Sequence, residues 1–236
     1  MRRRLLPIVL VTACGPPVAS TSADEKAHGA HGHGQHAHGQ HAHGGAHHDF
    51  SDAARWSAVF DDPAREAWQK PDEVVKLLAI EPGMTVVDVG AGTGYFEKRL
   101  SVAAGPSGKV LALDPEPNLV AFMRDRFQKE GVTNAEARTC PTDGTGLEPA
   151  SVDRVLIVDT WHHIEGRESY AKHLASILRP GGSVMIVDYT LEAEKGPPKE
   201  IRLGPDQVVR ELSAGGLKAA VAGESLPDQY VAIATK

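Results

Sequence analysis

A length of 236 residues with 41% hydrophobic content predicts one well-packed α/β domain with appendages, because two full domains would need a longer chain. The formal net charge is −6 at pH 7, and both signs of charge are mixed along the sequence. A nucleic-acid groove requires a concentrated basic face, so this composition excludes a nucleic-acid partner.

The first residues have the layout of a secretory signal. Three arginines precede the short apolar run Leu5–Ala13, which is about half the length of a bilayer-spanning helix. The stretch Val11–Cys14 resembles the lipobox of bacterial lipoproteins, which implies cleavage before Cys14 and acylation of that cysteine. We therefore expect a signal peptide at residues 1–13, a lipid anchor at the cell envelope and no disulfide to Cys140. A misassigned start or an unused signal would instead leave the protein cytoplasmic.

Residues 14–48 are rich in histidine, glycine and alanine and have too little apolar area to form a core, so we expect a disordered linker. Closely spaced imidazoles on a flexible chain can gather Zn, Ni or Cu without much selectivity. The alternative is a solvated tether. The candidate ligands are His28, His31, His33, His36, His38, His41, His43, His47 and His48.

Apolar residues return after Asp49, and residues 49–83 are predicted to form a small helical cap. Asp62 and Pro63 have the types expected at a helix N-cap and first turn, and Lys70–Pro71 is expected to open a second helix that runs to Ile80. This cap would fold over the mouth of a ligand site. Trp56 and Trp68 are candidates for a substrate lid, although such aromatic residues can also be core.

The segment Val86–Phe96, VVDVGAGTGYF, predicts a strand, a tight glycine turn and a helix. Glycine suits a backbone that turns sharply and contacts a ligand, and the start of the helix leaves N–H groups unpaired. The spacing G-x-G-x-G differs from the dinucleotide fingerprint G-x-G-x-x-G, which disfavours a nucleotide-dependent oxidoreductase.

Strands and helices then alternate through residues 84–236. Strands are expected at 109–113, 135–139, 152–158 and 183–187, helices at 95–104, 118–129, 170–178 and 205–214, and closing strands at 217–222 and 230–235. Nearly continuous apolar strands alternating with helices predict a parallel sheet covered on both faces. In such a sheet the ligand lies beyond the carboxyl ends of the strands.

Polar residues follow four of these strands. Asp88 precedes the glycine turn, and Asp114 is placed to accept hydrogen bonds from the two hydroxyls of a ribose. Asp143 is placed to accept from an exocyclic amine, and Asp159 precedes a pair of histidines. Each residue alone has a structural explanation, but together they predict a site for a ribose-bearing ligand.

Together these stretches resemble a class I S-adenosylmethionine-dependent methyltransferase. VVDVGAGTGYF matches the first motif of that family, LALDPEP the second, SVDRVLIVD the fourth strand, and LRPGGSVMIVDY the fifth strand with its glycine turn. The resemblance covers residues 72–236. It implies a doubly wound, Rossmann-like α/β sandwich with a mostly parallel seven-stranded sheet whose last strand is antiparallel.

The resemblance also implies roles for individual residues toward the cofactor S-adenosylmethionine. The glycine turn would support the methionine and ribose portions, Asp88 would orient the methionyl amine, and Asp114 would bind the ribose hydroxyls. Asp143 would accept from the adenine amino group, and Asp159 would hold the cofactor's amine or orient a histidine. The remaining cofactor-binding candidates are Gly90, Ala91, Gly92 and Gly94 in the turn, with Pro115 and Glu116 beside the adenine.

Methyl transfer requires alignment of an acceptor with the cofactor and exclusion of water, and it requires a base only if the acceptor must lose a proton. His162 and His163 are the candidates for that base, since imidazole titrates near neutral pH. No inserted substrate domain is visible in the sequence, which favours a small-molecule acceptor. The oligomeric state is not indicated.

Two of these predictions disagree, because S-adenosylmethionine is a cytosolic compound whereas a lipobox places the domain outside the cytosol. We expect an active methyltransferase, because the cofactor-binding positions carry suitable residues. The alternative is an envelope metal-binding lipoprotein in which the histidine tract is functional and the domain binds a ligand without catalysis.

Overall fold

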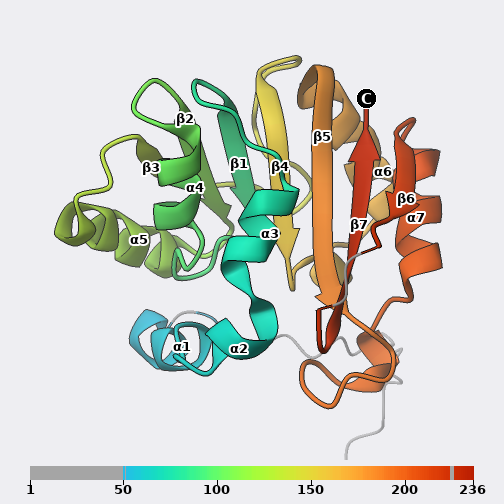
Figure 1. The fold of residues 1–236 in the computed structure, drawn as a ribbon, viewed down its shortest axis with the longest axis horizontal. Helices are drawn as coiled ribbons and strands as arrows, with labels where there is room; N and C mark the ends of the chain where they lie inside the picture. The colour runs from blue at the N-terminus through green and yellow to red at the C-terminus, as the bar shows by residue number, and fades with distance from the viewer. Residues whose placement is uncertain (1–49, 51, 224–225) are drawn as a thin grey trace, which may run out of the picture. The chain divides into compact units, whose positions relative to one another are not determined.

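The computed structural model describes residues 50, 52–223 and 226–236, which lie in one unit spanning residues 46–236. Its helices and strands alternate along the chain after a helical leader (Figure 1). In chain order they are α1 (Ala53–Phe60), α2 (Arg65–Gln69), α3 (Pro71–Leu77), β1 (Thr85–Val89), α4 (Glu97–Ala104), β2 (Lys109–Asp114), α5 (Pro117–Glu130), β3 (Ala135–Thr139), β4 (Val152–Val158), η1 (Trp161–His163), α6 (Arg167–Ile177), β5 (Leu178–Tyr189), η2 (Lys199–Ile201), α7 (Pro205–Ala214), β6 (Lys218–Val221) and β7 (Gln229–Thr235).

The strands form one seven-stranded sheet in the order β3-β2-β1-β4-β5-β7-β6. Strands β1 to β5 pair in parallel, and β1 sits centrally, with Val87 beside Leu111 of β2 and Val155 of β4. Strand β7 runs antiparallel to both β5 and β6. The predicted fold class is therefore confirmed. All of the parallel strands direct their carboxyl ends toward α1 and α2, at the bottom of Figure 1.

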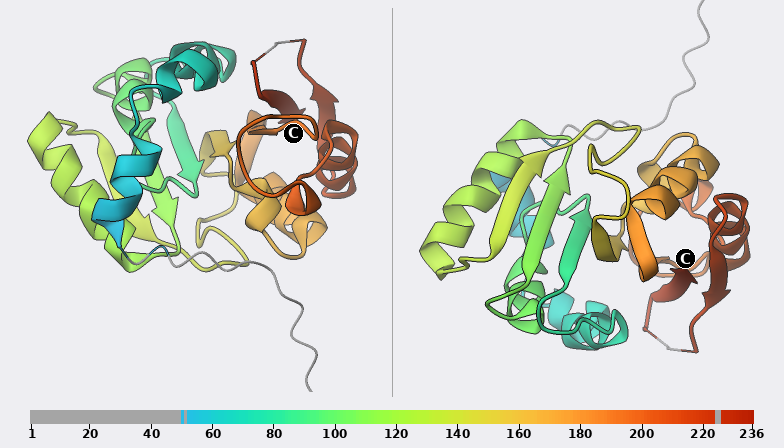
Figure 2. Two further views of the ribbon diagram at one scale, coloured as in Figure 1. Left: turned by 90° about the horizontal axis from the view of Figure 1, so that it is seen from below. Right: turned by 90° about the horizontal axis from the view of Figure 1, so that it is seen from above.

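Helices cover both faces of the sheet, as seen from either end in Figure 2. Neighbouring residues of β1 point to opposite faces: Val86 packs in the cluster that contains Leu100 of α4, and Val87 packs in the cluster that contains Leu174 of α6. Because both faces are buried, the central strands read as continuous apolar runs. Helix α5 packs on a third cluster through Met123.

Most boundaries agree with the sequence pattern. In the sheet domain the largest difference is β5, which spans Leu178–Tyr189 rather than 183–187. Further differences lie in the leader. Helix α2 begins at Arg65 with Ala64 as its N-cap, so Asp62 and Pro63 do not cap it as expected. The Asp62 carboxylate instead accepts the N–H of Ala64 at 2.8 Å, which closes a turn before the helix. Helix α1 was not predicted, and none of its residues is fully buried.

Three predictions concern residues 1–49, which lie outside the described residues: the signal peptide, the acylated Cys14 and the metal-binding histidine tract. Within the described ranges, no helix is long and apolar enough to cross a membrane. The same ranges contain no group of three or more His, Cys, Asp or Glu side chains that could hold a metal ion.

The Glu211 carboxylate of α7 joins three elements on the α6 face of the sheet. It accepts the indole N–H of the fully buried Trp161 at 2.8 Å, the Nε of Arg167 at 2.9 Å and the side-chain amide of Gln207 at 3.0 Å. These contacts fix η1, and hence the segment that follows β4, against α6 and α7.

We predict that Trp161→Phe lowers the free energy of unfolding by about 2–3 kcal/mol, because it leaves a cavity and removes one donor from a buried carboxylate. Urea unfolding of the full chain measures the loss. Trp68→Phe changes a partly exposed tryptophan and should cost less than about 1 kcal/mol. Equal losses in the two variants would contradict the anchoring role of Trp161.

Candidate active site

A cavity of about 460 Å³ lies beyond the carboxyl ends of the parallel strands. Its walls come from the end of β1 and the glycine turn, the ends of β2 and β4, and the leader helices α1 and α2. The residues nominated by sequence that line it are Asp88, Gly90, Ala91, Gly92, Asp114, Pro115, Asp159, His162 and His163. Gly94, Glu116 and Asp143 do not line it.

The glycine turn is held in a left-handed conformation, with φ of 75° at Gly90, 61° at Gly92 and 82° at Gly94. A Cβ on Gly90 would lie 2.4 Å from the side chain of Thr160, so only glycine fits there. A Cβ on Gly92 would meet Phe60 at 3.4 Å, in the space between the turn and α1. Gly94 has another role: a Cβ there would lie 3.2 Å from the side chain of Met123 on α5, so glycine permits close packing of the turn against this helix.

Asp114, at the end of β2, is bonded to the glycine turn and to the residue that precedes α5. One carboxylate oxygen accepts the N–H of Gly92 at 2.9 Å and the other accepts the N–H of Glu116 at 2.9 Å. Burial raises the pKa of Asp114 to about 6, and the two backbone hydrogen bonds oppose that rise. Each oxygen keeps lone pairs for further donors. The Glu116 side chain accepts the N–H of Asn118 and so serves the start of α5.

Asp143 is exposed in a turn that follows β3, outside the cavity wall. That turn is fastened to α6 rather than to the site, because the N–H of Thr145 donates to Nε2 of His173 at 3.0 Å. The expected contact between Asp143 and an exocyclic amine therefore has no support from its placement.

Asp159 follows β4 in a left-handed conformation with φ of 53°, which is unusual for a residue other than glycine. Its carboxylate accepts a hydrogen bond from the side-chain amide of Gln229 on β7. Burial raises its pKa to about 7, whereas the charge of Arg65, 3.8 Å away, lowers it. The carboxylate is therefore fixed at the cavity wall by a strained backbone and two partners.

Arg65 of α2 is a site residue that sequence reasoning missed, since it was assigned only to a leader helix. Its side chain is 12% exposed, and its guanidinium lies 4.2 Å from the ring centroid of Tyr95. It donates to the carbonyl of Phe60 at 2.8 Å and to the side chain of Gln69 at 3.1 Å, both neutral acceptors. Among the described residues, Asp159 is the one carboxylate with which Arg65 forms an ion pair. Arg65 thus brings a weakly compensated positive charge to the cavity.

His162 forms a buried pair with Asp188, a second residue that the sequence reasoning missed. Nδ1 of His162 lies 2.9 Å and 3.0 Å from the two carboxylate oxygens, and the side chains are 3% and 2% exposed. The carboxylate can only accept, so we assign the proton to Nδ1, which leaves Nε2 as the basic nitrogen. Asp188 also accepts the N–H of Tyr189 at 2.8 Å. The feature of the sequence that could have identified Asp188 is its position at the end of a strand, β5.

His163 is exposed at the cavity wall, and its ring lies 4.2 Å from that of His162. It packs edge-on against Phe50 at 6.3 Å. His162, by contrast, is oriented by the buried Asp188 carboxylate.

Aromatic side chains from the leader close the cavity. Trp56 stacks on Phe60 at 5.2 Å and contacts Phe50 at 4.7 Å, all on or next to α1. Trp68 of α2 packs 6.0 Å from Tyr189 at the end of β5. Both tryptophans line the cavity, as a lid requires.

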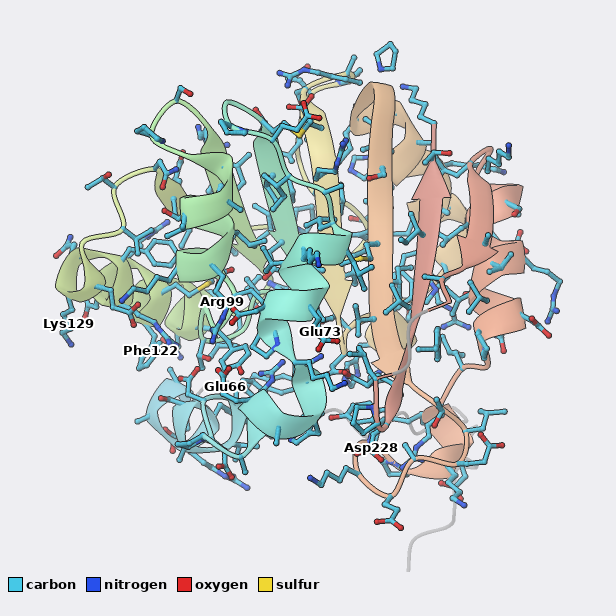
Figure 3. All side chains as sticks on the ribbon, in the orientation of Figure 1. Glu66, Glu73, Arg99, Phe122, Lys129 and Asp228 are labelled. Atoms are coloured by element: carbon cyan, nitrogen blue, oxygen red, sulfur yellow. The ribbon has the colours of Figure 1, made fainter. Side chains whose placement is uncertain are left out.

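Ion pairs attach the leader to the sheet domain. Arg99 of α4 bonds both oxygens of Glu66 at 2.8 Å and 2.9 Å, and these two side chains are labelled in Figure 3. Tyr95 donates its hydroxyl to the same Glu66 at 2.7 Å. Arg126 of α5 bonds Asp61 at 2.8 Å. The cap is thus held over the cavity by charged and polar contacts.

Comparison with known proteins points to one family. The profile of a methyltransferase domain family matches residues 86–182. A ubiquinone/menaquinone biosynthesis C-methyltransferase of Hydrogenovibrio crunogenus is 28% identical over 131 residues, 52% of this chain and 48% of that protein. A demethylmenaquinone methyltransferase of Lactococcus lactis is 25% identical over 138 residues, 58% of this chain and 54% of that protein. The chain therefore spans about half the length of these curated relatives.

A solved structure covers more of the chain. A SAM-dependent methyltransferase from Aquifex aeolicus superposes with a TM-score of 0.73 and 27% sequence identity, over 80% of this chain and 98% of that one. This likeness agrees with the α/β fold and seven-stranded sheet described above.

We predict that Gly90→Ala destabilises the fold more than Gly92→Ala. Both substitutions place alanine in a left-handed conformation, at about 1–2 kcal/mol. At Gly90 the new methyl also overlaps Thr160, which brings the expected loss to about 3 kcal/mol or more. Chemical unfolding of the two variants measures the difference, and equal midpoints would contradict the close approach of Thr160 to the turn.

Proposed function

We propose that the methyltransferase domain at residues 86–182 makes this chain an S-adenosylmethionine-dependent methyltransferase that acts on a small organic acceptor. The observation that carries the proposal is the hydrogen-bonded arrangement of the Asp114 carboxylate and the glycine turn. A buried carboxylate, fixed by the N–H of Gly92, faces a cavity beside a turn in which Gly90 and Gly92 have no side chains. That arrangement suits a ribose with its diol on the carboxylate and its neighbouring groups against bare backbone.

The residues present fit the cofactor. A Cβ on Gly92 would fill space between the turn and α1 that a ligand can use instead. Asp114 would hold the ribose hydroxyls, Asp88 would face the methionyl ammonium, and Arg65 would face the methionyl carboxylate. When bound, S-adenosylmethionine supplies a methyl group on a positively charged sulfur that leaves as a neutral thioether.

His162 is positioned to serve as the base. Nδ1 donates to Asp188, and Nε2 can accept the proton that an acceptor hydroxyl must lose. Asp188 holds the ring in one tautomer and stabilises the imidazolium that forms. Burial of both side chains keeps competing water away from this pair.

The cavity wall supports a flat, apolar acceptor with an acidic hydroxyl. Phe50, Trp56 and Phe60 on one side and Trp68 with Tyr189 on the other present aromatic faces. Such faces bind planar rings well, whereas a strongly charged acceptor would lose its hydration without enough partners. The curated relatives are named for ubiquinone and menaquinone biosynthesis, which also supports an aromatic ring as the acceptor class.

We expect calorimetry of the full chain to show binding of S-adenosylmethionine and of its demethylated product, S-adenosylhomocysteine. Asp114→Asn should weaken both about tenfold to a hundredfold, because it removes a charged acceptor of two hydroxyls. Asp125→Asn, an exposed change on α5, is the matched control and should leave the affinity unchanged. Asp143→Asn should also have no effect. Wild-type protein that binds neither compound would contradict the proposed function.

Transfer of a labelled methyl group to catechol tests the base. His162→Asn and Asp188→Asn should lower kcat about 10²-fold or more, while the affinity for S-adenosylhomocysteine stays within about threefold. His173→Gln on α6, outside the cavity, is the matched histidine control. An unchanged kcat in His162→Asn would remove His162 from the mechanism without affecting the cofactor assignment.

A further inference from the structure

Glu97, in the first turn of α4, is a buried acid that the mechanism above does not use. It is 0% exposed, and neither of its carboxyl oxygens has a hydrogen-bonded N–H or O–H donor within the described residues. Its carboxyl group lies under the glycine turn, where Gly94, Met123 and Phe127 come close together. An ionised carboxylate in such surroundings is strongly disfavoured, so the group takes up a proton instead.

The neighbour of this carboxyl group is a second acid, Asp88 of β1. The two carboxyl groups lie close enough for each to shift the pKa of the other, and Asp88 is 3% exposed. Two ionised carboxylates can only accept, so a hydrogen bond between them requires a proton on one of them. Asp88 lines the cavity and Glu97 does not, so Glu97 lies behind Asp88 as seen from the ligand side.

The surrounding charges indicate which acid holds the proton. Asp88 is faced by Arg65 from α2, whose positive charge favours ionisation, and by Asp114 from β2, which opposes it. Glu97 is faced by the negative charge of Asp88 and by Arg126 from α5. Burial raises the pKa of Asp88 to about 7, whereas burial and then the charge of Asp88 raise the pKa of Glu97 well above its usual range.

We propose that Glu97 is a positioning residue: it stays protonated at neutral pH and donates its O–H to Asp88, so that the pair presents one negative charge to the cavity. That single charge, aimed from Asp88, fits one ammonium group. This assignment rests on the proposed function, in which the ammonium is that of the methionine portion of the cofactor.

The pair makes cofactor binding depend on pH in a defined direction. As the pH falls below about 7, Asp88 takes up a second proton and its charge is lost, so the affinity decreases by up to tenfold per pH unit. Protonation of Asp114, with its pKa of about 6, adds to the decrease at lower pH. At high pH, loss of the Glu97 proton places two negative charges side by side in the buried site.

The test compares Glu97→Gln with Glu97→Met in the full chain. Glutamine keeps a donor for Asp88, so the affinity for S-adenosylhomocysteine at pH 7.5 should stay within about threefold of wild type. Methionine has a similar volume but no donor, so Asp88 should take up a proton more readily. Its affinity at pH 7.5 should fall about tenfold or more, and the acid decrease should move to higher pH.

Infrared difference spectra test the proton without any ligand. Wild-type protein at pH 7.5 should show the carbonyl band of a protonated carboxyl group, which Glu97→Gln reduces by about one group and Glu168→Gln, an exposed change on α6, preserves. Absence of that band in wild type, or an equal loss of affinity in the glutamine and methionine variants with unchanged thermal unfolding, would overturn the proposal. Wild-type protein that shows the band but binds no cofactor would instead contradict the proposed function.

Discussion

Two hydrogen bonds between neighbouring strand ends set the geometry of the site. The N–H groups of Gly90 and Ala91 both donate to the carbonyl of Leu113, at 2.8 Å and 3.1 Å, and the next residue along β2, Asp114, accepts the N–H of Gly92. The turn after β1 is therefore tied to the end of β2 by backbone and side chain together. Because these groups belong to paired strands of the core, the distance between the carboxylate and the bare backbone is as rigid as the sheet.

The buried acids of the site lower the stability of the fold when they are ionised. Asp88 and Asp114 have pKa values raised by burial above the value of about 4 in an unfolded chain, so the fold loses stability as the pH rises from about 4 until both groups are ionised above about 7. A sequence selected for stability alone would replace such groups with amides or apolar residues. The charge of Arg65 offsets part of the cost of burying Asp88 and Asp159, but it does so from the leader rather than from the sheet. The electrostatics of the site therefore depend on closure of the cap.

The parts that sequence predicted well are those that local chemistry determines. The strands follow from apolar runs, the turn follows from the spacing of Gly90, Gly92 and Gly94, and the place of Asp114 follows from the rule on strand ends. Asp143 also follows a strand end, but it does not line the cavity, and its turn is hydrogen-bonded to α6 through Thr145 and His173. The sequence did not identify Arg65 and Asp188 as site residues. Their roles arise from contacts between distant segments, namely α2 with Tyr95 and β5 with η1.

The cap and the sheet domain are stabilised by different kinds of interaction, and that difference bears on how a ligand reaches the cavity. The sheet is held by fully buried side chains on both faces, whereas α1 has none. Its attachment, and that of α2, relies on pairs such as Arg126 with Asp61 and Arg99 with Glu66, whose side chains are 21% to 48% exposed. Partly exposed ion pairs contribute about 0–1 kcal/mol each and weaken with salt. Opening at the cap therefore costs less free energy than opening anywhere in the sheet, and it uncovers the same aromatic wall and the same Arg65 that complete the site when the cap is closed.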